Sequence, residues 1–525
     1  MASLDCLPNE LKDYISAHLS SNDLLRLSTT CRALYAYAQP LAYRNVTLTW
    51  SRHQQKSRSP QLYALLRTLL ENPNHASGVR QLAFEAERCL YFVVDGYGEY
   101  DSETDQHYMD RGSLKVNIPG CHKKPEEEEM ALLHRAIASQ ELEGHGNWKD
   151  EAIRSQELFA CMAMIVTHCD KLESLDVSVA FTIASNWFEE LIQIGGPGPD
   201  GSSIWLENLR HLRLSCNTGG YDWTPRCMEI QQAALYAFYL PKLQTLELVQ
   251  FHNPFDEQME DTDFEACFWP AMHQDIPLAL TTLRFIRTSV SPRTLRTLLE
   301  RTPNLRTLEF DAFENHEINL FDFFDFKSAI DIVKETLTSL TLRFEYYADE
   351  DNDPRWVNEA TTGCLGPFRD YLALENLEIS LHTLFGRDAE PDGRLPPLAH
   401  MLPRNLQTLT ITDDFWLYDD FQQAFMDFDA MAIFRRFLAG QVLAEGETYH
   451  RRFSVTGVQR WTQVLPQPEW RIATPKLKKC VYDLRKRGYL SREYWNKGKA
   501  RKQFRTMCKE QGLRGEVLWE KIQYY

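Results

Sequence analysis

The sequence predicts an α/β fold in which a small helical region precedes a long array of strand-plus-helix repeats. Three observations support this prediction. The hydrophobic spacing of the first fifty residues is helical, a six-residue apolar pattern returns along the body of the chain, and helical stretches separate its copies. A chain of 525 residues can hold two or three ordinary domains or one extended array.

The composition is typical of a soluble globular protein, with 43% hydrophobic and 25% charged residues. The longest uninterrupted apolar run contains "FACMAMIV", far short of the roughly twenty residues that a membrane span needs. No basic region typical of a secretory signal precedes "LPNEL". We therefore expect no membrane contact and a cytoplasmic or nuclear location.

Charge and cysteine usage exclude further classes. The net charge of −17 disfavours nucleic-acid binding, because that affinity comes mostly from basic residues that neutralise phosphates. The twelve cysteines form no CxxC pair, which argues against a zinc site and against a disulfide framework. Reduced thiols are the simplest interpretation.

The N-terminus predicts two amphipathic helices. The first, about Asn9 to Leu19, carries apolar residues four apart, and Pro8 suits its first turn. "SSND" then offers Ser21 or Asn22 as the N-cap of a second helix, and Pro40 begins a third short piece, "PLAYRNVTL". The second helix has one apolar face, formed by Leu24, Leu27, Cys31, Leu34 and Ala38. About fifty residues give a marginal core, so the rest of the chain or a partner must complete it.

These residues resemble the F-box motif over about Leu4 to Leu48. The matching positions are Leu7, Pro8, Glu10, Leu11, Ile15, Leu19, Asp23, Leu24, Leu27, Cys31, Arg32, Leu34, Pro40, Leu41 and Tyr43. Tyr35 and Tyr43 stand where the family often has tryptophan. The resemblance implies docking to the Skp adaptor of a cullin–RING ubiquitin ligase. The residues expected to contact the adaptor are Leu7, Pro8, Leu11, Ile15, Leu24, Leu27 and Leu34, although some of them must instead hold the helices together.

The body of the chain repeats an apolar-x-x-apolar-x-apolar pattern. Eight clear copies begin at Leu172, Leu209, Leu243, Leu280, Leu305, Leu337, Leu374 and Leu406. They are 25 to 37 residues apart, with a degenerate earlier copy at Val79 and a later one at Leu477. The period of two within each copy predicts a short strand, and the recurrence predicts a stacked array.

Helical stretches such as "PRTLRTLLERTPNL" lie between the copies, with Leu295, Leu298 and Leu299 on one face. The strand-plus-helix unit resembles the leucine-rich repeat in a long, irregular form. The asparagine or cysteine that usually follows the third apolar residue is inconsistent, since Asn217 and Asn253 come near it and most copies lack it. The alternative is an ordinary α/β fold with chance matches.

Residues between the buried apolar positions should form a target-binding face. They are Asp176, Arg213, Glu247, Arg284, Glu309, Arg343 and Glu378. Their mixed signs indicate no ligand of a single charge, and each could equally be an ordinary strand-surface residue.

We expect three parts: a helical domain at 1–50, the array at 51–440 with a polar, partly disordered insertion at about 85–150, and a terminal repeat with a basic cap at 441–525. From Arg471 to Arg514 there are 15 Lys or Arg and three acids. This basic stretch could be a nuclear signal, bind an acidic partner, or be a solvated helix face.

No catalytic residue, cofactor site or metal site is predicted. "GGPGPDG" from Gly195 lacks the phosphate-loop pattern, and the "DEDND" acids lack the spacing of a calcium loop. His168 and Cys169 are adjacent, and adjacent residues on a helix diverge by about 100°, so they cannot readily pair. Cys169 is better interpreted as a buried structural thiol.

The leading hypothesis is a substrate-recognition subunit of an SCF-type cullin–RING ligase, whose repeats hold an unidentified target protein near the ubiquitin carrier. The alternative is a repeat scaffold for protein binding without ligase work, in which the N-terminal helices merely cap the array. A third possibility, an enzyme, would require a convergent polar pocket that the linear sequence does not show.

Overall fold

In the computed structural model the chain forms two compact units. The first is Met1–Val249 with Pro254–Leu280, and the second is Gln250–Asn253 with Thr281–Tyr525. The structure describes residues 7–16, 18–51, 59–87, 89–94, 98–101, 112–116, 126–139, 158–178, 181, 191–192, 206–215, 234–251, 268–269, 276–315, 321–347, 361–386, 397–414, 427–443, 461–484 and 499–518.

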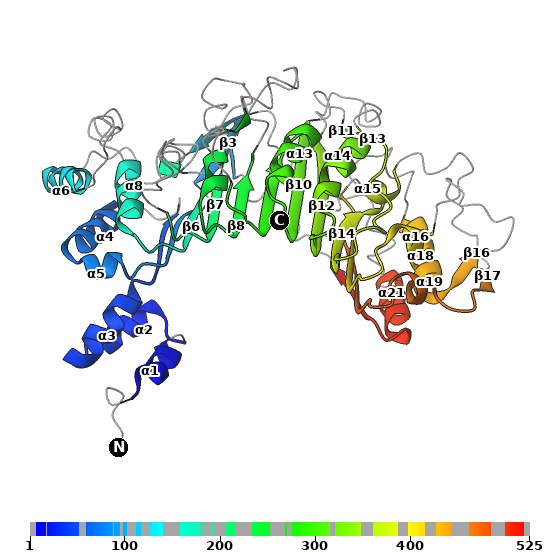
Figure 1. The fold of residues 1–525 in the computed structure, drawn as a ribbon, viewed down its shortest axis with the longest axis horizontal. Coiled ribbons are helices and arrows are strands. Elements are labelled where there is room, and N and C mark those ends of the chain that lie inside the picture. The colour runs from blue at the N-terminus through cyan, green and yellow to red at the C-terminus, as the bar shows by residue number, and fades with distance from the viewer. Residues whose placement is uncertain are drawn as a thin grey trace. The chain divides into compact units, whose positions relative to one another are not determined.

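The first unit begins with three helices that lead into a parallel sheet (Figure 1). The helices are α1 (Asn9–Ser16), α2 (Ser21–Ser28) and α3 (Arg32–Ala42). The strands, in their order across the sheet, are β1 (Asn45–Ser51), β2 (Gln81–Glu87), β6 (Ser174–Val177), β7 (His211–Ser215) and β8 (Thr245–Val249). Between them lie α4 (Ser59–Glu71), α5 (Pro73–Ala76), α6 (Glu127–Ala138), α8 (Leu158–His168) and η3 (Tyr236–Tyr239).

The second unit repeats this architecture with seven parallel strands in the described residues. They are β9 (Thr282–Thr288), β10 (Thr307–Asn315), β12 (Ser339–Tyr347), β14 (Asn376–Ser380), β15 (Thr408–Thr412), β18 (Lys479–Asp483) and β19 (Arg514–Leu518). Its helices are α13 (Pro292–Glu300), α14 (Phe323–Ile330), α15 (Leu381–Phe385), α16 (Leu398–Met401), α18 (Asp427–Phe434), α19 (Glu469–Ala473) and α21 (Lys499–Glu510), with short turns η4 (Asp331–Val333) and η6 (Arg435–Ala439). Two small sheets pair β11 (Phe321–Asp322) with β13 (Thr361–Thr362) and β16 (Gln441–Leu443) with β17 (Trp461–Val464).

All ten predicted copies of the repeat pattern form strands. Their central apolar residues stand in register within each unit, as in the row Leu82, Leu175, Leu212 and Leu246 of the first unit. These side chains are almost completely buried. Each strand therefore buries its apolar row within the parallel sheet.

Two strands escaped the sequence pattern. In β1, Val46 is in register with Leu82, so "YRNVTL" is a further copy with Tyr43 in the first apolar place. In β19, Gly515 occupies the leucine position opposite Cys480. A side chain cannot fit there, because an added Cβ would lie 2.6 Å from the Cβ of Cys508 on α21.

A recurring backbone contact joins successive repeats. The amides of Arg80 and Gln81 both donate to the carbonyl oxygen of Arg44, at 2.8 and 3.0 Å. Equivalent pairs donate to Arg80, Glu173 and Arg210 in the first unit, and to Thr281, Arg306, Thr338, Glu375 and Gln407 in the second. One carbonyl thus satisfies two amides at the entrance to each of these strands.

The core of the second unit contains a row of phenylalanines. Phe285, Phe310 and Phe344 contact each other in sequence, with ring centroids 5.9 and 6.0 Å apart. Phe326 of α14 packs edge-on against Phe310 at 4.8 Å. All four rings are fully buried, so α14 is fixed to β10 and β12 by aromatic packing.

The N-terminal helices differ from the prediction at their ends. The first helix stops at Ser16, and the N-cap of α2 is Ser20, whose hydroxyl accepts from the Asp23 amide, in place of Ser21 or Asn22. The predicted second helix is two helices. The Thr29 and Thr30 hydroxyls donate back to carbonyls of α2 and end it, and α3 then includes Pro40.

The polar insertion at 85–150 contains regular structure where it is described. Antiparallel strands β3 (Leu90–Val94), β4 (Gly98–Asp101) and β5 (Gly112–Val116) form one small sheet. The acidic run at Glu126–Glu129 begins α6, where the Glu129 carboxylate accepts from the Glu126 amide at 2.9 Å. Negative charge is favourable at a helix N-terminus, so this run has a structural role. "GGPGPDG" and the "DEDND" acids lie outside the described residues.

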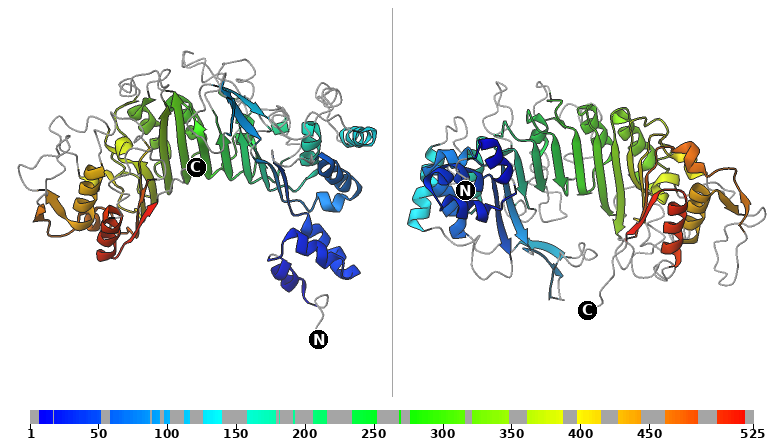
Figure 2. Two further views of the ribbon diagram at one scale, coloured as in Figure 1. Left: turned by 180° about the vertical axis from the view of Figure 1, so that it is seen from behind. Right: turned by 90° about the horizontal axis from the view of Figure 1, so that it is seen from below.

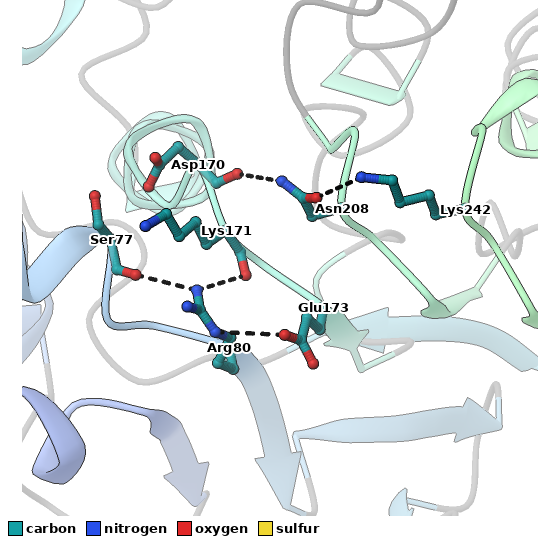
Figure 3. A network of polar contacts seen from close by, with 7 residues as sticks. All are labelled: Ser77, Arg80, Asp170, Lys171, Glu173, Asn208 and Lys242. Atoms are coloured by element: carbon teal, nitrogen blue, oxygen red, sulfur yellow. Dashed lines mark hydrogen bonds and ion pairs between the residues drawn. The ribbon is translucent and has the colours of Figure 1, made fainter.

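Two asparagines link neighbouring repeats. Each stands directly before the first leucine of its copy of the pattern, a position for which the sequence pattern made no prediction. In Figure 3 the Asn208 amide donates to the Asp170 carbonyl at 3.1 Å and its oxygen accepts from Lys242 at 2.8 Å. Asn405 likewise donates to the Leu372 carbonyl in the second unit. Beside Asn208 in Figure 3, Arg80 bridges the Ser77 and Lys171 carbonyls and pairs with Glu173 at 3.4 Å.

We expect Asn208→Ala to lower the free energy of unfolding by about 1 kcal/mol, since it removes both inter-repeat hydrogen bonds at a partly exposed site. Urea unfolding measures the change. Glu207→Ala, at the exposed neighbour, is the matched control and should have no effect. An equal loss in both variants would contradict the link.

Candidate functional site: the N-terminal helices and the strand face

Helix α1 turns its polar side toward the other helices. Its Asp13 carboxylate accepts from the hydroxyl of Tyr37 on α3 at 2.6 Å, Lys12 lies over the same ring, and Ser16 is buried. On an α-helix these positions lie opposite Leu11, Tyr14 and Ile15. The apolar stripe of α1 is therefore directed away from its own helical neighbours.

The helical core is made by α2 and α3. Leu24, Ala38 and Ala42 form a buried cluster, with four partly buried residues packed against it: Leu19, Leu27, Tyr37 and Leu41. Described residues of α1 contribute no member of this cluster. Helices α2 and α3 thus enclose a small core, and the apolar side chains of α1 lie outside it.

The seven residues predicted to contact an adaptor divide by burial. Leu11 is 50% exposed and Pro8 is exposed, whereas Leu7 and Ile15 are half-buried. Leu24 and Leu34 are buried at 5% and 7% exposure, and Leu27 packs against the core. Leu24, Leu27 and Leu34 therefore hold the helices together. The sequence alone could not tell these residues from those free to contact a partner.

Three exposed residues of the same helices were not predicted. Tyr14, Leu25 and Tyr35 are 69%, 42% and 50% exposed. Tyr35 was noted as a departure from the family pattern, and Tyr14 as a flank of the first stripe. The missing signal was the direction of α1, because periodicity shows that a stripe exists but not where it points.

Comparison with protein families identifies these helices. Residues 4–49 match the family model described as F-box-like. No curated protein matches the chain. The F-box-like domain thus covers α1, α2, α3 and most of β1. The matched model does not extend over the repeats, so leucine-rich-repeat membership stays a prediction.

The F-box-like domain joins the first repeat without a linker. Two residues, Tyr43 and Arg44, separate the end of α3 from the start of β1. The Tyr43 ring stacks on His75 of α5 at 4.8 Å and 12°, and Arg44 supplies the first shared carbonyl. Burial lowers the pKa of His75, which favours the neutral ring in this stack. The boundary expected at residue 50 falls inside β1.

On the strand face, the seven predicted target-binding residues pair with one another. In the first unit, Arg213 lies 3.5 Å from Asp176 and 2.9 Å from Glu247. In the second, Glu309 lies 3.5 Å from Arg284 and 3.9 Å from Arg343. Arg343 also contacts Glu378 at 2.5 Å. The alternating signs therefore neutralise each other across strands, which explains their mixture without a ligand.

Arg343 differs from the others in register. Thr341 is the residue in register with Glu309 and Glu378. Arg343 lies two residues further along the strand, in register with Asp311. The arginine reaches back over Thr341 to both acids. Its pKa is raised by Glu378, Asp311 and Asp414, although burial opposes this effect.

The strand face gives a pH prediction. Burial raises the pKa of Glu309 even though Arg343 and Arg284 lower it. An acid whose pKa is higher in the folded than in the unfolded state destabilises the fold while it is ionised. This destabilisation is lost as pH falls through the folded-state pKa toward the unfolded-state pKa of 4.5. Relative to Glu309→Gln, which cannot titrate, the wild-type chain should therefore gain stability as pH is lowered from 7 to the unfolded-state pKa. Thermal unfolding across this range measures the difference, and a wild-type loss would contradict the prediction.

The adjacent residues His168 and Cys169 each have a structural environment. Cys169 is 3% exposed and burial raises the pKa of its thiol to about 12, while His168 shares a hydrogen bond with the Met164 carbonyl at 2.7 Å. In the part of the chain that the structure describes, every cysteine is a free thiol and no group of three metal-ligating side chains occurs. No described helix is long and apolar enough to cross a membrane.

Proposed function

We propose that the chain is a substrate-recognition subunit of an SCF-type cullin–RING ubiquitin ligase. In this function the F-box-like domain binds a Skp-type adaptor, which connects to a cullin, and the repeats hold a target protein. F-box proteins are generally non-catalytic adaptors, so other subunits would transfer ubiquitin. The target protein would react with the ubiquitin carrier because the complex holds the two close together. A cytoplasmic or nuclear location is part of the proposal.

One observation carries this proposal: the apolar stripe of α1 lies outside the core of its own domain. Leu11 and Tyr14 are half or more exposed while the polar face of the same helix contacts α3. Exposing large apolar side chains is unfavourable unless a partner covers them. With the exposed Leu25 and Tyr35, they are the surface we assign to the adaptor.

Size-exclusion chromatography of the full chain with a purified Skp-type adaptor tests the proposal. We expect one co-eluting complex, and a control mixture with an unrelated acidic protein of similar size should separate. Elution of the chain and the adaptor as two independent peaks would contradict it.

A second function, a repeat scaffold capped by the helices, is favoured by one observation. The helices lead directly into the first strand of the array, because β1 follows α3 after two residues and pairs with β2 along its length. A fragment that starts near residue 55 would lose β1 and expose β2, so it cannot separate docking from capping. A fragment that starts at Tyr43 keeps β1, the His75 stack and the Arg44 carbonyl. If the helices only cap, this fragment should aggregate.

A further inference from the structure

In the described part of the basic stretch near the C-terminus, several exposed positive charges have no carboxylate partner. The surface comprises six exposed residues, Arg471, Lys476, Lys502, Arg505, Lys509 and Arg514. We propose that this C-terminal basic surface binds an extended acidic segment of a target protein. The proposal rests on the proposed function for the identity of its ligand as a target, but not for the binding itself.

Helix α21 separates its apolar and basic residues cleanly. Ala500, Phe504, Met507 and Cys508 are buried, and Phe504 packs against Phe434 of α18 at 4.9 Å. Lys502, Arg505 and Lys509 follow at intervals of three and four residues and are all exposed. The helix lies against β19 (Figure 2), so its core face is already occupied and its basic stripe remains outside.

Most positive charges of this surface have no carboxylate partner, unlike those of the strand face. The side-chain ammonium groups of Lys476, Lys502 and Lys509 make no hydrogen bond or ion pair with any described residue. Arg514 and Lys479 share one carboxylate, Glu516, at 2.6 and 2.8 Å, which leaves one positive charge over. On the strand face, by contrast, each arginine is matched by a carboxylate.

Hydrogen bonds connect the stripe to its neighbours. Arg505 reaches the Val517 carbonyl of β19 at 3.5 Å, and Arg471 of α19 donates to Gln511 at 3.4 Å, just beyond the end of α21. The amide of Arg514 donates to the carbonyl of Lys478 at 2.9 Å. The stripe, the α19 arginine and the start of β19 therefore form one continuous surface.

The spacing fits an extended acidic peptide. Residues three and four apart on a helix are separated by about 4.5 and 6 Å along its axis. In an extended chain, side chains on the same side recur at about 6.6–6.8 Å. A peptide with acids at alternate positions can thus place successive carboxylates beside Arg505 and Lys509.

Nucleic acid fits this surface less well. Nucleic-acid affinity comes mostly from basic residues that neutralise phosphates, and the net charge of −17 on the chain opposes approach of a long polyanion. The helix dipole favours a cation at Lys509, near the end of α21, but it does not account for Lys476, Lys502 or Arg471. Attraction to an acidic protein segment accounts for the whole set.

Fluorescence anisotropy with the full chain tests the proposal. The probe is a labelled short peptide of alternating Glu and Ser, and the same peptide with Lys in place of Glu is the negative probe. We expect the acidic peptide to bind and binding to weaken as salt rises. The triple variant Lys502→Glu, Arg505→Glu, Lys509→Glu should lose about tenfold or more in affinity, equal to about 1.4 kcal/mol.

The matched control is Arg301→Glu, Arg306→Glu, Arg369→Glu, which reverses three exposed charges elsewhere in the same unit. It should bind like the wild type. Equal loss in both triple variants, no binding of the acidic peptide, or tighter binding of a single-stranded oligonucleotide would overturn the proposal. Neither triple variant should change adaptor co-elution, so the docking function and the acidic-segment site can fail separately.

Discussion

Replacing Phe310 by alanine should lower the free energy of unfolding of the second unit by about 3–5 kcal/mol. The ring is fully buried and contacts three other phenylalanines, on β9, α14 and β12. Because these partners come from separate repeats and a helix, the cavity cannot be filled by the movement of one neighbour. The loss should therefore lie at the upper end for a core truncation.

Denaturant unfolding followed by circular dichroism measures this change, and hydrogen exchange places it in the second unit. Phe324→Ala is the matched control, since Phe324 lies on α14 in the same unit but is 62% exposed. It should cost no more than about 1 kcal/mol. Similar losses for the two phenylalanines would show that the buried row does not hold the repeats together.

The double substitution Leu11→Asp, Tyr14→Gln should weaken adaptor binding by about a hundredfold or more. Both side chains belong to the outward stripe of α1, and charged or polar groups there could not be buried against an apolar partner without a large desolvation cost. Because neither residue belongs to the helical core, the domain should keep its fold. Isothermal titration with a purified Skp-type adaptor measures the affinity.

Leu278→Asp is the control for that experiment, because Leu278 is 60% exposed in the same unit but lies outside the F-box-like domain. It should leave the affinity unchanged. If the α1 variant binds the adaptor as tightly as the wild type, the outward stripe is not the docking surface.

The sequence predicted the strands of the array well, because the apolar-x-x-apolar-x-apolar pattern follows directly from burial on one side of a parallel sheet. It missed β1 and β19, because Tyr43 just before β1 and Gly515 within β19 stand where the pattern expects leucine. Both substitutions have tertiary causes. Tyr43 stacks on His75, and Gly515 leaves room for Cys508. The first contact joins residues more than thirty positions apart, and the second depends on how α21 packs on β19. A local sequence pattern cannot reveal either of them.

The candidate site was less predictable than the fold. Seven strand-face residues could be named from the alternation of buried and outward positions, but their mutual pairing depended on cross-strand distances that the sequence does not contain. In the helical domain, Leu24 and Leu11 occupy similar places in their helical patterns, yet one is buried and the other exposed. The difference arises from the contact between Asp13 and Tyr37, which turns α1 outward.

The most direct test of the docking function compares the proteins that co-purify with the intact chain and with a chain that begins at Tyr43. The shorter chain keeps β1 and its contacts with β2 and α5, so the array should remain folded. We expect quantitative mass spectrometry to find a Skp-type adaptor and a cullin with the intact chain and neither with the shorter one, while target proteins stay with both. Equal recovery of the adaptor with both chains, or its absence from the intact chain, would contradict the account.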